Sequence, residues 1–186
     1  MKLSTKESQK YYEILSKLLY AVNEKRHVVL EFDISDIMAI DLEKSAKIRE
    51  ELWSNTECLK DIIAEGEVHG FTAEELEILG EWHDYHIYSE FIIAEHRANH
   101  TVFMDIKNEE RLYAVVGLLD PLKKVVPPRF MPGLAVTVLL PFKGKIIYDG
   151  ILGMVDTSED PLPREDFNKS YREAKRKWGT SFKLGG

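Results

Sequence analysis

The sequence predicts an α+β protein with a helical N-terminal half, a small antiparallel β-meander or SH3-like barrel, and a C-terminal helix. Apolar residues recur at three/four spacing through most of residues 1–86, as in amphipathic helices. From residue 87 to 157, short runs rich in β-branched and aromatic residues alternate with turn residues. Because helices and strands are segregated, we expect a helical region, then a β-unit, then a helix and tail over 158–186 that pack on the same core.

The first helix is predicted over residues 5–23. Ser4 followed three residues later by Glu7 fits a capping box, in which each side chain accepts a hydrogen bond from the other residue's backbone amide. One apolar stripe runs along this helix and consists of Tyr11, Ile14, Leu15, Leu18, Leu19 and Val22.

The next segment, residues 27–40, is compatible with a strand or with a helix, because periodicity does not separate the two in a short apolar run. Helical spacing returns over residues 41–64 and predicts a second helix, which Gly66 and Gly70 end.

A third helix is predicted over residues 73–84. Thr72 and Glu75 form a second capping box, and Phe71 and Leu76 occupy the positions of a hydrophobic staple.

Five or six short strands are predicted in the β-unit, and their spacing favours an antiparallel meander, rolled into a barrel or left as a curved sheet. The predicted runs are residues 91–93, 101–104, 112–116, 135–140 and 145–148, with 151–155 as the sixth. Turns are expected at 97–100 and 107–110. A last helix is predicted over 164–178, with Phe167, Tyr171, Ala174 and Trp178 on one face.

The stretch LLPFKGKIIYDG, residues 139–150, has two interpretations. A glycine between Lys143 and Lys145 resembles an anion-binding turn, so both lysines are candidate anion or partner contacts. However, both flanks have the composition of strands, which favours a hairpin across residues 143–145 with a bend at Asp149-Gly150.

The net charge is −7, which argues against general binding to a phosphate backbone. The charge is uneven, because residues 161–186 carry seven Lys and Arg against three acids, a balance of +4. This basic segment either contacts an anionic partner or neutralises the acidic remainder of the chain. Its candidate contacts are Arg172, Lys175, Arg176 and Lys177.

Histidines cluster in one region, since five of the six lie between positions 69 and 100. Two imidazoles close in space can share a metal ion with a carboxylate. The candidate ligands are His83, Asp84, His86, His96 and His100. No HExxH or CxxC motif accompanies them, so surface and turn histidines are the competing interpretation, and no cofactor is expected.

Other features limit the function classes. Cys58 is the single cysteine and lies in a predicted amphipathic helix, which indicates an inert thiol and excludes an intrachain disulfide. The chain has no apolar run long enough to span a bilayer and no signal-like N-terminus, so we expect a soluble cytoplasmic protein without membrane contact. Nucleotide-binding glycine motifs and GxSxG are also absent.

Part of the chain resembles a family of uncharacterised bacterial proteins, a domain of unknown function, with the pattern W…FxI…YxVxGL…PL…LLPFxGKIIYDG. The matching residues are Trp82, 91–93, 113–118, 120–122 and 139–150. The resemblance implies a bacterial cytoplasmic setting and carries over no activity, cofactor or site residue.

The leading functional hypothesis is therefore a non-enzymatic binding or interaction module, with a protein as its partner. Two alternatives stay open. One is a metal-dependent hydrolase that uses the His83–His100 histidine cluster, and the other is a nucleic-acid-binding protein that uses the β-unit and the basic C-terminal helix.

Overall fold

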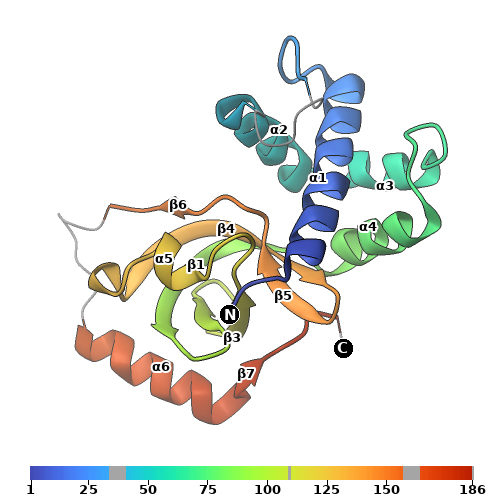
Figure 1. Cartoon of the computed structure of the whole chain (residues 1–186). Helices are drawn as coiled ribbons and strands as arrows, with labels where there is room; N and C mark the ends of the chain where they lie inside the picture. Colours follow the sequence, from blue (N-terminus) through green and yellow to red (C-terminus); the bar gives the residue numbers. More distant parts are fainter. Residues whose placement is uncertain (34–40, 109, 157–163, 186) are drawn as a thin grey trace. The chain divides into compact units, whose positions relative to one another are not determined.

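The computed structural model describes residues 1–33, 41–108, 110–156 and 164–185 (Figure 1). The chain divides into two compact units. The helical unit is Ser4–Asp84, and the sheet unit is Met1–Leu3 together with Tyr85–Gly186. The first three residues belong to the sheet unit because Lys2 forms a parallel bridge with Gly117.

The described residues of the helical unit form four helices, and both predicted capping boxes are confirmed. Ser4 and Glu7 exchange hydrogen bonds at the start of the first helix, and Thr72 and Glu75 do so at the start of the fourth. Apolar stripes from these helices form a core in which Tyr11, Leu18, Ile48, Leu59 and Trp82 are fully buried. The helices are α1 (Thr5–Arg26), α2 (Leu42–Ser54), α3 (Glu57–Ala64) and α4 (Ala73–Tyr85).

The prediction of one helix over residues 41–64 was wrong, because the structure has two helices there. Asn55 ends α2 in an extended conformation, and its side-chain oxygen accepts a hydrogen bond from the Glu57 amide at the start of α3. An asparagine side chain competes with the helical backbone in this way. The ambiguous segment is irregular over residues 27–33, and the rest of it lies outside the described residues.

Seven strands lie in the part of the sheet unit that the structure describes, and all six predicted strand runs are among them. The seventh strand, at the C-terminus, was not predicted. The strands are β1 (Ile87–His96), β2 (Thr101–Asp105), β3 (Leu112–Val116), β4 (Gly133–Phe142), β5 (Lys145–Tyr148), β6 (Gly153–Met154) and β7 (Thr180–Ser181). The connection from β3 to β4 contains the short helices α5 (Leu122–Val125) and η2 (Pro128–Phe130).

The strand order is not that of a purely antiparallel meander, and the sheet is mixed. β1 pairs antiparallel with both β2 and β4, and β3 pairs parallel with β5. Together with the antiparallel β2–β3 and β4–β5 pairs, these contacts join five strands in the cyclic order β1-β2-β3-β5-β4-β1. The meander prediction failed because pairings between strands distant in sequence leave no local signal.

Two buried aspartates fix turns of the sheet unit. Asp105 is fully buried at the end of β2 and accepts hydrogen bonds from the Ser89 hydroxyl at 2.6 Å and the Lys107 amide at 3.0 Å. Asp149 accepts one from the Ile151 amide at 3.1 Å. Because buried carboxylates need such partners, both residues have a structural role.

The predicted hairpin in residues 139–150 is confirmed, with a tighter turn than expected. Phe142 pairs with Lys145, so the loop has only two residues, Lys143 and Gly144. Both have positive φ, 50° and 72°, as the favoured two-residue hairpin turn requires. Gly150, with a φ of 96°, makes the predicted bend after β5.

Candidate functional site

Helix α6 (Arg164–Trp178) packs against β1, β2 and β3 and coincides with the predicted C-terminal helix. Figure 1 shows it running beside the strands. Ala174 is buried against Ile92, Val102, Met104 and Leu112, and Phe167 and Tyr171 pack on the same cluster. The apolar face of α6 is therefore used in packing. The exposed basic residues of α6 are Lys169, Arg172, Lys175, Arg176 and Lys177.

The end of α6 carries an aromatic ring between basic side chains. The Arg111 guanidinium carbon lies 3.8 Å from the centroid of the Trp178 ring, and the Lys177 ammonium lies 4.3 Å from it. Both distances are within the range of cation–π attraction. Trp178 stays partly exposed, so this position combines a planar apolar surface with positive charge.

Two turns earlier on α6, Tyr171 donates a hydrogen bond to Glu95 of β1, which also pairs with Arg97. Burial raises the pKa of Tyr171, and the bond to Glu95 raises it further, to about 12. Burial opposes ionisation of Glu95, but the hydrogen bonds from Tyr171 and Arg97 outweigh it and lower the Glu95 pKa. Glu95 is thus an ionised carboxylate whose charge Arg97 compensates.

The C-terminal tail connects α6 to the turn between β1 and β2. Gly179, with a φ of 68°, ends the helix, and β7 then pairs parallel with β3. Beyond β7, the exposed Phe182 places its ring edge-on to His100, with 5.2 Å between ring centroids. We call the resulting patch the basic-aromatic surface. It consists of Arg97, His100, Arg111, Tyr171, Lys175, Lys177, Trp178 and Phe182.

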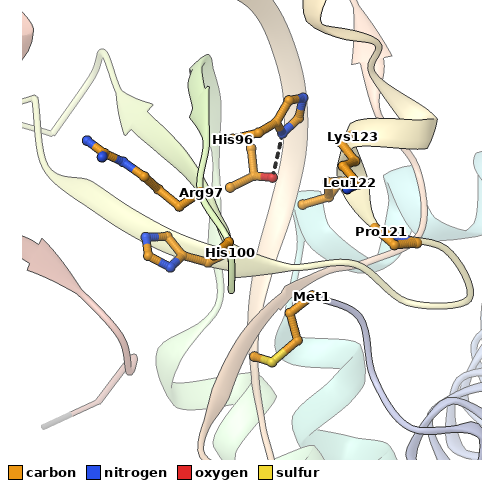
Figure 2. A pocket seen from close by; sticks show the side chains of 9 residues that line it. Met1, His96, Arg97, His100, Pro121, Leu122 and Lys123 are labelled. Atoms are coloured by element: carbon orange, nitrogen blue, oxygen red, sulfur yellow. Dashed lines mark hydrogen bonds between the residues drawn. The ribbon is translucent and has the colours of Figure 1, made fainter.

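A small open pocket of about 140 Å³ adjoins this surface at the turn between β1 and β2. Figure 2 shows its lining approaching from three parts of the chain, residues 96–101 on one side, 121–123 on the other, and Met1 at the N-terminus. His96 holds the first two segments together, since one ring nitrogen bonds the Thr101 hydroxyl at 2.8 Å and the other bonds the Val126 carbonyl at 2.9 Å. A carbonyl only accepts, so Nε2 carries a proton.

The predicted metal ligands are distributed over both units of the chain. His83 and Asp84 contact each other at 2.8 Å in the helical unit, whereas His86, His96 and His100 belong to the sheet unit. Both ring nitrogens of His96 are engaged by protein groups. Within the part of the chain that the structure describes, no three His, Cys, Asp or Glu side chains are grouped to hold a metal ion.

The predicted anion contacts fall on two elements. Lys143 and Lys145 lie at the turn between β4 and β5, where Lys143 is exposed and Lys145 is partly buried. The four basic residues predicted on the last helix are all exposed on α6. Sequence reasoning missed Arg111, because its contact with Trp178 spans 67 residues and no local pattern predicts it.

Charge is divided unequally between the two units. The sheet unit has sixteen Lys and Arg and thirteen Asp and Glu, a formal charge of +3. The helical unit has nine Lys and Arg and nineteen Asp and Glu, a formal charge of −10. The net charge of −7 therefore does not describe the environment of the basic-aromatic surface.

No protein-family model, curated protein or solved structure matches this chain. The resemblance to a bacterial family therefore stays a prediction. None of the helices in the described ranges combines the length and apolar character that crossing a membrane requires.

Proposed function

We propose that this chain is a non-catalytic binding protein, and that its sheet unit binds single-stranded nucleic acid on the basic-aromatic surface. The observation that carries the proposal is the position of Trp178, partly exposed and flanked by Arg111 and Lys177 on a unit of charge +3. Proteins that bind single strands combine aromatic rings, on which bases stack, with basic side chains that follow the backbone.

The strand order supports a binding role. We infer that the five cyclically paired strands form a small barrel of the oligonucleotide/oligosaccharide-binding type, in place of the SH3-like barrel expected from sequence. Such barrels bind ligands on the face of their second and third strands and on the loops that follow the first and fourth. Here α6 packs against β1, β2 and β3, so the proposed surface lies on α6 and on the turn after β1.

The two other hypotheses have less support. A hydrolase using the histidine cluster would need several of the candidates His83, Asp84, His86, His96 and His100 to hold one ion, and His96 already bonds protein groups through both ring nitrogens. A protein partner, the leading prediction from sequence, stays a prediction, and an acidic polypeptide serves as its probe in the experiment below.

Fluorescence anisotropy with a labelled oligothymidylate of about twenty nucleotides tests the proposal. We expect binding at low ionic strength that weakens with added salt, because basic residues displace counterions from the strand. Lys177→Glu should weaken binding and reduce the salt slope by about one unit. The matched control is Lys47→Glu, since Lys47 is exposed in the helical unit and should leave binding unchanged.

Three results would overturn the proposal. The first is that the oligonucleotide does not bind at low salt. The second is that Lys177→Glu and Lys47→Glu weaken oligonucleotide binding equally. The third is that polyglutamate binds more tightly than the oligonucleotide. Thermal unfolding of each variant verifies that a loss of binding does not come from a loss of fold.

A further inference from the structure

The pocket between the β1–β2 turn and α5 has a positively biased lining. Among its nine lining residues, His96, Arg97, His100 and Lys123 carry basic side chains, and none is an Asp or Glu. Lys123 is exposed and His100 is partly exposed, so both can be reached from solvent. This lining suits an anion.

The basic groups around the pocket differ in their availability. The Arg97 guanidinium pairs with Glu95, and both His96 nitrogens bond protein groups. Lys124, next to Lys123, pairs with Asp120 at 3.0 Å and does not line the pocket. Lys123 therefore supplies the charge that a bound anion would meet first. Burial and the nearby Arg97 lower the pKa of His100, so its imidazole offers a hydrogen-bonding ring nitrogen rather than a charge.

The volume limits what the pocket holds. A cavity of about 150 Å³ accommodates a molecule the size of benzene. The pocket, at about 140 Å³, has room for a group of five or so heavy atoms, such as a tetrahedral phosphate. A base with its sugar would have to lie outside the opening, on the neighbouring basic-aromatic surface, which His100 joins to the pocket through its contact with Phe182.

We propose that this pocket binds the phosphate group of a phosphomonoester, with the Lys123 ammonium and the His100 imidazole as its contacts. The source of the phosphate is either the terminal phosphate of a bound strand or a small phosphate compound. Only the first source rests on the proposed nucleic-acid function.

Titration of the ¹⁵N-labelled full chain with inorganic phosphate tests the pocket directly, with sodium chloride adjusted to hold ionic strength constant. We expect saturable amide shifts in residues 96–101 and 121–124. Lys123→Ala should weaken the apparent affinity about tenfold, the effect of one lost charge-assisted hydrogen bond. Lys124→Ala is the matched control and should change the affinity less than twofold. The proposal is overturned if the shifts do not saturate, or if the two variants behave alike.

A second arm identifies the source. Anisotropy is measured with the oligothymidylate carrying a 5′-phosphate, a 3′-phosphate or no phosphate. A preference for one phosphorylated end that Lys123→Ala abolishes supports the strand terminus, and saturable phosphate binding without an end preference supports a small phosphate compound. If inorganic phosphate binds but no oligonucleotide does, the nucleic-acid function fails while the pocket proposal stands.

Discussion

Arg111, at the start of the β3 segment, lies with its guanidinium carbon 3.8 Å from the centroid of the Trp178 ring at the end of α6. The contact attaches the last turn of the helix to the sheet, beyond the packed face that Phe167, Tyr171 and Ala174 form. Because Ala174 is the residue of this packed face nearest the end of α6, we expect the ring contact to hold the final turn of the helix.

We therefore expect Arg111→Ala to lower the free energy of unfolding by about 1 kcal/mol and to reduce hydrogen-exchange protection selectively in α6 and β7. Lys177→Ala, which removes the more exposed cation at 4.3 Å, should cost less than half as much. Equal protection of α6 in wild type and Arg111→Ala would show that the contact does not hold the helix.

Tyr171 provides the second polar attachment of α6, through its hydroxyl bond to Glu95. Tyr171→Phe should destabilise the fold by about 1–2 kcal/mol, because Glu95 stays ionised and loses one of its two partners. Tyr88→Phe is the control, since Tyr88 is 48% exposed, and should change stability by less than about 0.5 kcal/mol.

The pKa of Tyr171 gives this contact a pH signature. Its folded-state value of about 12 lies above the ordinary 10, so the folded state retains the phenol proton more strongly than the unfolded state. The stabilisation should be complete below about pH 10 and disappear as the pH rises through about 12. Ultraviolet difference titration of wild type against Tyr171→Phe should show one phenol ionising near the higher value, and ionisation near pH 10 would contradict the contact.

Much of the fold follows from local signals, which explains what sequence reasoning found and what it missed. Three predicted features depend on residues within a few positions of one another, so the sequence pattern alone indicates them. They are the bounds of α6, the two capping boxes and the β4–β5 hairpin. The β1–β4 and β3–β5 pairs depend on the register between strands that are distant in the sequence. A strand such as residues 112–116 is buried on both faces, so its sequence does not alternate between apolar and polar residues and does not specify that register.

The candidate site follows the same division. The basic and apolar faces of α6 were predictable from spacing, whereas the partners Arg111, Glu95 and His100 reach α6 and the tail only through the tertiary fold. Whole-chain net charge describes the candidate site poorly for a related reason. It averages two units of opposite formal charge, whose boundary becomes visible only when the contacts are known.

The buried carboxylate of Glu75 should make the stability of the helical unit sensitive to acid. Only 2% of Glu75 is exposed, and it accepts hydrogen bonds from the Lys10 ammonium at 2.8 Å, the Thr72 amide at 2.9 Å and the Lys17 ammonium at 3.1 Å. Burial opposes ionisation, but these hydrogen bonds outweigh it and lower the pKa of Glu75 to about 2. The folded state then binds fewer protons than the unfolded state between about pH 4.5 and 2, so stability falls as the pH drops through this window.

Glu75→Gln should lower the free energy of unfolding by about 2 kcal/mol near neutral pH, and the difference from wild type should shrink as the pH approaches 2. Denaturant unfolding of both proteins at several pH values measures this difference in the free energy of unfolding. The neighbouring Glu74→Gln is the matched control, because the Glu74 side chain is 55% exposed and 4.0 Å from Lys10. A difference that stays constant with pH would mean that the ionic contacts of Glu75 do not stabilise the fold.

Two glycines allow a paired test of the β4–β5 turn. Gly144 has a φ of 72° with no atom within 4 Å of an added Cβ, and Gly80 lies inside α4 with equally open surroundings and no positive φ. Gly144→Ala should therefore destabilise the fold by about 1 kcal/mol through backbone strain alone. Gly80→Ala should stabilise it by about 0.5–1 kcal/mol, because alanine favours the helix. Thermal unfolding gives both signs, and a neutral Gly144→Ala would mean that the turn does not hold the left-handed conformation on which the β4–β5 register depends.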